Sequence, residues 1–266
     1  MPRRRYNFIN KLGRLPRTFD PRVPHLSAAM AGRRRPPPPA AVDYTKSATS
    51  RLPAELGMLL NDKLQNCTCA AYYHARQVWT FHAKGAPITE NDSDVKLLYE
   101  EACGYKPSEP GGGPGGVVQH VLRFLHKDGA PIGAGGDKRD KTVAYLEVDP
   151  RNTDDVKRTI ADCGVAYVGL NVPQNVLPHE AEVPKVWTVD PKASEIIEGH
   201  AVVLPGYDAS GPIVISWGKF YRMTWEFFHE YVDEVYAVAD DAWVTATKRT
   251  PAGLTLPQLA ELMKYV

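Results

Sequence analysis

The most informative segment of this chain is Asn61-Asp62-Lys63-Leu64-Gln65-Asn66-Cys67-Thr68-Cys69-Ala70-Ala71. Its first six residues are mostly polar and predict a loop. From Cys67 to about Ala83 the residues have high helix propensity, and their apolar side chains recur with helical spacing. Cys67 is therefore expected to be the first residue of a helix.

A thiol at the N-terminus of a helix is a candidate nucleophile. Unpaired backbone N–H groups and the positive end of the helix dipole stabilise the thiolate there, so its pKa should fall below the ordinary value of about 8.5. The preceding loop can supply the amide of Asn61 as an oxyanion donor beside the N–H of Cys67. Cys69 lies further inside the helix and is interpreted as a core thiol. A metal site made of Cys67, Cys69 and His74 would need a fourth ligand and is not expected.

A partner for this thiol is expected at His200. The segment Gly199-His200-Ala201-Val202-Val203-Leu204-Pro205-Gly206-Tyr207 begins with a glycine and a histidine and continues as an apolar strand. A histidine at the start of such a strand can present its ring at the edge of a sheet. The pattern indicates a thiolate with an imidazole base, which is the minimum for nucleophilic catalysis by cysteine.

The other predicted elements place helices early in the chain and strands late. Helices are expected at about 93–102, capped by Asp92 or Ser93, and at 117–126, about 153–162 and 225–231, with strands at 143–148, 165–172, 201–204, 213–216 and 235–239. The glycine-rich run at 111–116 lacks the Lys and Ser or Thr of a phosphate loop and is interpreted as a flexible connector. This order predicts an α+β protein with a cleft between a helical half and an antiparallel sheet half.

Taken together, these motifs resemble those of the papain-like cysteine peptidase superfamily. The stretch 61–71 resembles the family's Gln-Gly-x-x-Gly-Ser-Cys-x-Ala, and 199–207 looks like its histidine strand. Ser216-Trp217-Gly218 matches the end of its Asn-Ser-Trp-Gly motif. The nucleophile and the histidine are 133 residues apart, inside the range of about 130 to 150 typical of the family. Over about residues 55–255 the resemblance is closest to papain-like proteins encoded by phages and prophages.

The resemblance implies a role for three residues. Cys67 would be the nucleophile and His200 the general base, and Asn61 occupies the place of the oxyanion-hole glutamine. The resemblance implies a papain-like fold, and neither a cofactor nor a metal is expected.

One position departs from the family pattern. The family has an asparagine directly before Ser-Trp-Gly, and this asparagine orients the histidine. Here Ile215 stands in that place and cannot accept a hydrogen bond from an imidazole. Ser216 or an acid such as Asp208 could replace the asparagine, and the sequence does not choose between them.

Two functional hypotheses follow. The first is a thiol hydrolase of amide bonds, a peptidase or a cell-wall amidase or endopeptidase, carried as a component of a phage virion. The second is a catalytically idle papain-fold structural protein of a phage particle, anchored by its N-terminal arm. Cys67 and His200 favour the first hypothesis and Ile215 favours the second.

Residues 1–53 are predicted to form an extended basic arm, and residues 54–266 the papain-like domain. Residues 1–39 contain ten Lys or Arg and a single acid, Asp20, although the whole chain has a formal charge of +1. The proline run 36–39 favours a stiff polyproline segment. The arm could be a solvated tail, a strap on another virion or assembly protein, or, least favoured, a nucleic-acid contact. Scattered apolar residues favour the strap, namely Tyr6, Phe8, Ile9, Leu12, Leu15 and Phe19.

The sequence has no stretch near the roughly 18 to 20 apolar residues of a membrane span and no apolar core of a secretory signal. We therefore expect the protein in a virion or in the host cytoplasm, and not embedded in a membrane. Its four cysteines are too few for a disulfide scaffold in a chain of this length.

Overall fold

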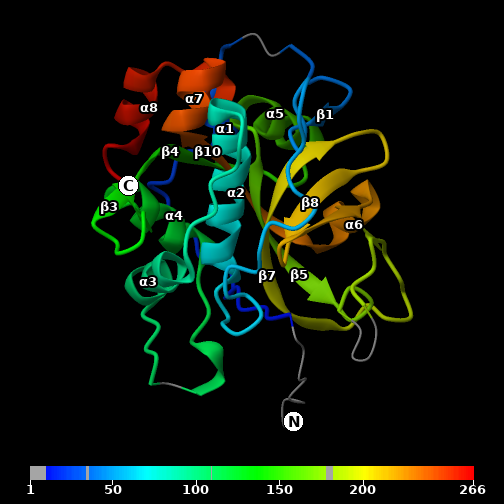
Figure 1. The fold of residues 1–266 in the computed structure, drawn as a ribbon. Helices are drawn as coiled ribbons and strands as arrows, with labels where there is room; N and C mark the ends of the chain where they lie inside the picture. The colour runs from blue at the N-terminus through cyan, green and yellow to red at the C-terminus, as the bar shows by residue number, and fades with distance from the viewer. Residues whose placement is uncertain (1–9, 34–35, 109, 178–181) are drawn as a thin grey trace.

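A long central helix organises the molecule. The computed structural model describes residues 10–33, 36–108, 110–177 and 182–266, so the first nine residues of the predicted arm and its Arg34 and Arg35 lie outside the described residues. Helix α2 (Cys67–Lys84) runs between helices α3, α4, α7 and α8 on one side and strands β5, β7 and β8 on the other (Figure 1). Every residue from Cys67 to Phe81 is buried. The predicted helix beginning at Cys67 is confirmed.

The remaining helices begin and end where local chemistry favours it. They are α1 (Leu26–Ala29), α3 (Asp92–Cys103), α4 (Val118–Lys127), α5 (Thr153–Cys163), α6 (Trp225–Tyr231), α7 (Asp241–Thr247) and α8 (Leu256–Met263). Asn152 caps α5 by accepting a hydrogen bond from the N–H of Asp155. The expected cap at Asp92 or Ser93 is wrong, because α3 starts one residue earlier, after Asn91.

The strands form one large sheet that is almost entirely antiparallel. Its strands are β1 (Val42–Asp43), β4 (Thr142–Val148), β5 (Ala166–Pro173), β6 (Val186–Trp187), β7 (Ile196–Tyr207), β8 (Pro212–Ser216), β9 (Lys219–Met223) and β10 (Val232–Asp240). The order is β4-β10-β5-β7-β8-β9-β6, with β1 paired antiparallel to β7 and β6 paired parallel to β9. A separate hairpin joins β2 (Ala130–Ile132) and β3 (Lys138–Asp140). The predicted α+β class is confirmed.

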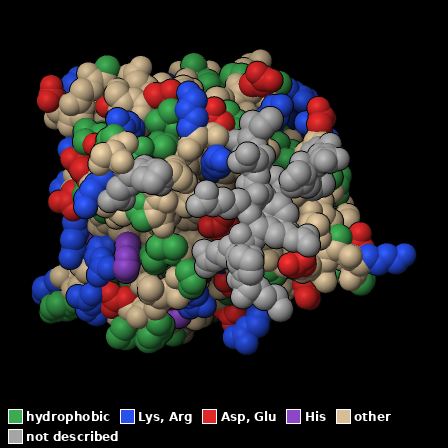
Figure 2. All heavy atoms as spheres, turned by 90° about the horizontal axis from the view of Figure 1, so that it is seen from below, with side chains coloured by type: hydrophobic (Ala, Val, Ile, Leu, Met, Phe, Trp, Pro, Cys, Tyr) green, Lys and Arg blue, Asp and Glu red, His purple; other side chains and the backbone are tan. Residues whose placement is uncertain are grey.

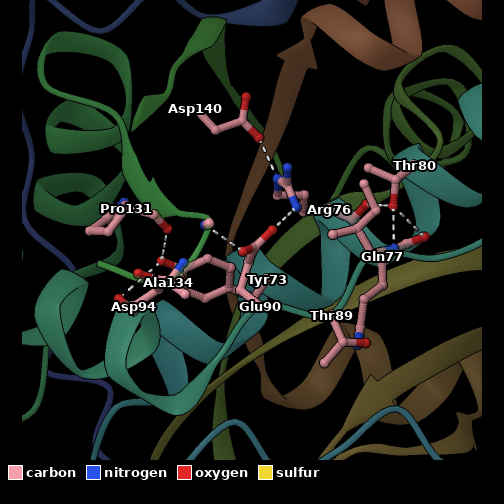
Figure 3. A network of polar contacts seen from close by, with 12 residues as sticks. Tyr73, Arg76, Gln77, Thr80, Thr89, Glu90, Asp94, Pro131, Ala134 and Asp140 are labelled. Carbon is pink, nitrogen blue, oxygen red and sulfur yellow. Dashed lines mark hydrogen bonds and ion pairs between the residues drawn. The ribbon is translucent and has the colours of Figure 1, made fainter. Parts of the chain in front are cut away.

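A buried polar network holds α2 against the helical half of the molecule (Figure 3). Arg76 of α2 binds Glu90, which precedes α3, and its Nε donates to Asp140 of β3 at 2.5 Å. Asp94 of α3 accepts a hydrogen bond from the N–H of Ala134 at 2.9 Å, in the turn between β2 and β3. Three elements are thereby fixed to one another by charged hydrogen bonds, which are stronger than neutral ones.

The described part of the N-terminal arm packs against later residues of the same chain. Strand β1 pairs with β7, and the Tyr207 hydroxyl donates to the carbonyl of Pro39 at 2.7 Å. Leu26 of α1 is buried in the core. Contacts of the arm with its own chain were not among the three predicted roles, and the division of the chain at residue 53 stays a prediction. On the face seen from below, acidic and basic side chains are interspersed (Figure 2). None of the helices in the described ranges is long and apolar enough to cross a membrane.

Candidate active site

The start of α2 lies against strand β7. Cys67 is completely buried, and its sulfur accepts a hydrogen bond from the backbone N–H of Ala201, the residue after His200. Burial raises the pKa of the Cys67 thiol to about 12, although the Ala201 N–H acts in the opposite direction. The structure therefore brings the predicted nucleophile to the strand that carries the predicted base, and holds it there as a neutral thiol.

His200 is oriented by two contacts. Its Nε2 lies 2.8 Å from the hydroxyl oxygen of Ser216, at the end of β8. Its ring stacks on Trp217, with centroids 4.5 Å apart and planes tilted by 17°. The other ring nitrogen, Nδ1, is buried and makes no hydrogen bond. Burial, and after it the positive charge of Arg14, lowers the pKa of His200 to about 3, so the imidazole is neutral in this conformation.

The imidazole is therefore contacted by Ser216. This residue directly follows Ile215, which stands where the family pattern has its orienting asparagine. Ile215 itself is fully buried opposite Val203 of β7 and serves the core. Asp208, the other candidate, accepts hydrogen bonds from Arg222 and from the Ser210 hydroxyl, both at 2.6 Å. Of the two residues considered from the sequence, the one next to the histidine is Ser216.

Asn61 is buried in the loop that precedes α2. Its amide nitrogen donates to the carbonyl of Leu64 at 3.1 Å and to the side-chain oxygen of Asn66 at 3.3 Å. Both amide hydrogens are therefore used within the loop, and an oxyanion contact by Asn61 stays a prediction. The N–H of Cys67 belongs to the first turn of α2, where N–H groups have no partner inside the helix.

A part of the N-terminal arm, residues 11–15, crosses these residues, and we call it the covering segment. It joins the glycine-rich run at Gly116 to strand β7 at Gly199. The hydrogen bonds run from Trp217 Nε1 to the Lys11 carbonyl (2.9 Å), from the N–H groups of Gly13 and Arg14 to the Gly199 carbonyl (3.2 and 3.0 Å), from the Leu15 N–H to the Gly116 carbonyl (2.9 Å), and from the Gly116 N–H to the Gly13 carbonyl (2.8 Å). The covering segment is thus held by main-chain hydrogen bonds on both sides.

Glycines allow this close approach. Gly13 has a φ of 126°, and a Cβ there would lie 2.4 Å from the carbonyl oxygen of Gln65. A Cβ at Gly199 would lie 2.4 Å from the carbonyl oxygen of Arg14. With the covering segment in this place, both Cys67 and His200 have almost no exposed surface.

The side chain of Arg14 fixes the covering segment to the sheet. Its guanidinium donates to Glu234 at 2.8 Å, to Asp233 at 3.0 Å and to the side-chain oxygen of Asn171 at 3.0 Å. Burial lowers the pKa of Arg14, whereas the two carboxylates raise it. The net shift is upward. Arg14 is therefore buried and fully charged, and it attaches the arm to the sheet. The composition of the arm shows only that it is basic.

No metal ligand set accompanies these residues. Within the described ranges, no group of three or more His, Cys, Asp and Glu side chains could hold a metal ion. Cys69 is buried with its sulfur 4.0 Å from that of Cys103, and Nδ1 of His74 lies 2.8 Å from the side-chain oxygen of Gln77. These side chains serve the packing of α2.

Comparison with known proteins gives the fold its name. No protein-family model and no curated protein matches the chain. Xylellain, a cysteine protease from Xylella fastidiosa, matches 88% of this chain and 97% of its own, with a TM-score of 0.64 and 18% identity. Procathepsin B S9 from Trypanosoma congolense matches 88% of this chain and 87% of its own, with a TM-score of 0.57 and 12% identity. The cysteine protease and lectin-like domains of Cwp84 from Clostridium difficile match 87% of this chain and 57% of their own, with a TM-score of 0.59 and 11% identity.

The fold is that of the papain-like cysteine proteases. The fold expected from the sequence motifs is confirmed, and at these identities the likeness concerns the fold alone. None of the three proteins is described as a phage protein, so the closer resemblance to phage-encoded members stays a prediction. The matches over 88% of the chain are longer than residues 54–266 and therefore include part of the N-terminal arm.

The covering segment was not predicted from the sequence. Arg14 was one arginine among many, and the run at 111–116 was interpreted as a flexible connector, although Gly116 binds the covering segment on both its N–H and its carbonyl. One signal was available. Asp233 and Glu234 directly precede the apolar run 235–239, and an acid that such a strand buries needs a cationic or hydrogen-bonding partner.

Proposed function

We propose that this protein is a thiol peptidase that is latent in the conformation described, with Cys67 as nucleophile and His200 as base. The proposal rests on the contacts made by His200 and by the residue that follows it. Nε2 is held by Ser216, Nδ1 makes no hydrogen bond, and the neighbouring N–H of Ala201 binds the sulfur of Cys67. A histidine held through one nitrogen and unpaired at the other is arranged to exchange a proton.

The chemistry follows from these positions. Nδ1 of His200 takes the proton of the Cys67 thiol, and the thiolate attacks the carbonyl carbon of an amide. The oxyanion forms near the N–H of Cys67 at the start of α2, with the Asn61 amide as the proposed second donor. His200 gives its proton to the leaving amine, and a thioester remains. Water, activated by the same imidazole, then hydrolyses the thioester and regenerates the thiol.

Access to this chemistry requires displacement of the covering segment. Cys67 and His200 are buried, and burial holds both in their neutral forms. When water enters, the penalty on the charged forms falls, so the pKa of the thiol drops and that of the imidazole rises. Latency is also consistent with the match to procathepsin B, a protein whose name marks it as a precursor form.

A polypeptide is the substrate that the site favours over a cell-wall crosslink. The covering segment is itself a peptide, and its main chain is hydrogen bonded to Gly116 on one side and Gly199 on the other. A substrate that replaces it needs a main chain with the same donors and acceptors. A cell-wall amidase or endopeptidase activity remains the second choice, because a short peptide stem offers fewer such groups.

The alternative, a catalytically idle papain-fold structural protein, rested on Ile215. Ser216 supplies a contact to the imidazole that Ile215 cannot, which weakens that reason. A virion location and a contact between the arm and an assembly protein remain proposals. A contact with an assembly protein and peptidase activity are connected, since any partner that binds residues 11–15 would also uncover Cys67.

The test is the rate at which iodoacetamide alkylates Cys67 as a function of pH, with the modified cysteine identified by mass. The natural chain, Arg14→Ala and the double variant Arg14→Ala/His200→Ala are compared. We expect slow alkylation of the natural chain, and fast alkylation of Arg14→Ala that persists well below pH 8.5 because an imidazolium stabilises the thiolate. The double variant should lose the reactivity below pH 8.5.

Hydrolysis of a fluorogenic peptide by Arg14→Ala then separates a reactive thiol from an enzyme. Turnover that disappears in Arg14→Ala/Cys67→Ser supports the proposal. If Arg14→Ala is alkylated only above about pH 8.5, like a free thiol, and removal of His200 changes nothing, the protein is idle and the proposal fails.

A further inference from the structure

The residues that hold Arg14 belong to the domain and not to the arm. Asn171 lies on β5, and Asp233 and Glu234 lie on β10, two neighbouring strands of the central sheet. We call these three residues, with Gly169 of β5, the Arg14 site. A Cβ at Gly169 would lie 2.4 Å from the Glu234 carboxylate and 2.8 Å from Cδ of Arg14, so only glycine leaves room there. The site therefore remains when the arm departs.

The Arg14 site is built for a guanidinium. The Glu234 side chain has no exposed surface, and its second oxygen accepts a hydrogen bond from the Tyr236 hydroxyl at 3.2 Å. Asn171 donates to Asp233 at 3.1 Å while its own oxygen accepts from Arg14, which fixes the acceptors relative to one another. A planar fork with several N–H donors matches such a set, whereas the ammonium of lysine is a point charge.

An empty Arg14 site would be unfavourable. A buried carboxylate without a cation costs several kcal/mol, and the pKa of Glu234 is already raised by burial, with Arg14 acting in the opposite direction. Asp233 also has a buried oxygen, Oδ1, that no hydrogen bond uses. Strands β5 and β10 thus carry a charged site whose occupant in this conformation, Arg14, belongs to the covering segment.

The Arg14 site opens directly beside the proposed catalytic residues. Arg14 donates its backbone N–H to the carbonyl of Gly199, the residue before His200. A peptide that takes the place of the covering segment along Gly199 and Gly116 therefore directs one side chain into this site. The position of that side chain relative to the reacting thiol is fixed by the same main-chain hydrogen bonds.

We propose that the Arg14 site is the specificity site of the enzyme and selects an arginine side chain in the substrate peptide. This inference rests on the proposed peptidase function for its biological meaning, but not for its binding chemistry. The covering segment acts as a substrate mimic that keeps the site occupied until a partner or a cleavage removes it. An arginine-containing peptide then satisfies Asp233, Glu234 and Asn171 as Arg14 does.

The first experiment measures binding without catalysis. Full-length Arg14→Ala is titrated with n-butylguanidine, and its melting temperature is followed, with n-butylamine as the matched cation and the natural chain as the occupied control. We expect a concentration-dependent rise of a few degrees with the guanidine, a much smaller one with the amine and none in the natural chain. Glu234→Gln on the Arg14→Ala background should abolish the rise. If Arg14→Ala does not fold, Arg14→Gln, which keeps most of the side-chain stem, takes its place in the titration.

The second experiment measures specificity at the thiol. Peptidyl acyloxymethyl ketones that differ only in an Arg, Lys or Leu side chain are reacted with Arg14→Ala, and labelling of Cys67 is followed by mass. We expect the arginine probe to label at least about 100-fold faster than the leucine probe, because a site built around charged acceptors rejects an apolar analogue. The ratio should fall below about tenfold in Arg14→Ala/Glu234→Gln.

The outcomes distinguish the peptidase proposal from the specificity inference. Guanidine binding without labelling of Cys67 supports the Arg14 site and overturns the peptidase proposal. Labelling with no preference for arginine supports the peptidase and overturns the specificity inference. A thermal response equal for the guanidine and the amine also overturns it, since the site would then be a general cation site.

Discussion

Nε2 of His200, within β7, and the hydroxyl oxygen of Ser216, at the end of β8, lie 2.8 Å apart, and both residues are buried. This contact makes Ser216 a positioning residue, and we predict that Ser216→Ala slows the uncovered enzyme. A buried nitrogen left without its partner costs about 1 to 3 kcal/mol. If all of that falls on the transition state, kcat/KM decreases roughly 5- to 150-fold. The measurement is peptide hydrolysis by the variant on the Arg14→Ala background.

Two further readouts distinguish positioning from simple destabilisation. Without an acceptor at Nε2, the imidazolium is less stable, so the alkaline limb of the pH–rate profile should move to lower pH. Ser216→Thr keeps the hydroxyl and should retain most of the activity. An unchanged pH profile in Ser216→Ala would show that the serine only packs against the ring.

Gly13 offers a way to remove the cover without touching the Arg14 site or the catalytic residues. Its φ is 126°, and a Cβ at this position would lie 2.4 Å from the Gln65 carbonyl oxygen, which leaves no room for alanine. We predict that Gly13→Ala increases alkylation of Cys67 at pH 7 by roughly 5- to 150-fold, because a strained backbone position costs roughly 1 to 3 kcal/mol. Gly32→Ala is the matched control, since Gly32 has a φ of 72° and open space around its Cβ position. Equal alkylation rates in the two variants would mean that residues 11–15 do not limit access.

Acid should loosen the cover of a variant that lacks the Cys67 thiol. In the covered form the pKa of His200 is lowered to about 3 by burial, whereas a histidine in water titrates near about 6.5. In Cys67→Ala, where no thiol proton can pass to the imidazole, a proton therefore binds more tightly to the uncovered form. The stability of the cover in this variant is fully present above about pH 6.5 and decreases by about 1.4 kcal/mol per pH unit below it, until about pH 3.

This dependence is measurable by hydrogen exchange at the N–H groups of Gly13 and Arg14, which both bind the Gly199 carbonyl. After correction for the intrinsic pH dependence of exchange, we expect protection in Cys67→Ala to fall roughly 10- to 30-fold from pH 7 to pH 5. Cys67→Ala/His200→Gln, which has no titrating imidazole at this position, should show a flat profile. Equal protection of Cys67→Ala at both pH values would contradict the assignment.

The fold was largely predictable because its signals are local. A helix that begins at Cys67, the helix expected at about 153–162 and the apolar strand after His200 each depend on neighbouring residues. Their order along the chain then limits the architecture. The cap of α3 was placed wrongly because Asn91, Asp92 and Ser93 are all residues that favour caps, and the choice among them depends on packing.

The site was predictable only in part because its remaining contacts are distant in sequence. Ser216 and Asp208 were equal candidates until the sheet placed one beside His200 and the other beside Arg222. Arg14 and Glu234 are 220 residues apart, and no local pattern relates them. A basic arm and an acidic strand end suggest attraction, but only the folded chain shows which arginine is buried.

Arg76 offers a test of how strongly α2, and with it Cys67, is held in place. The guanidinium contacts Glu90 and Asp140, and both the Arg76 and Glu90 side chains are less than 10% exposed (Figure 3). Arg76→Met keeps the apolar stem and leaves two carboxylates near each other without a cation, one of them buried. We predict a loss of about 3 to 5 kcal/mol in the free energy of unfolding, measured by urea denaturation. Lys96→Ala breaks the exposed pair with Glu100 and should change the stability by less than about 0.5 kcal/mol. A comparable loss in both variants would mean that the network around Arg76 adds no more than a surface ion pair.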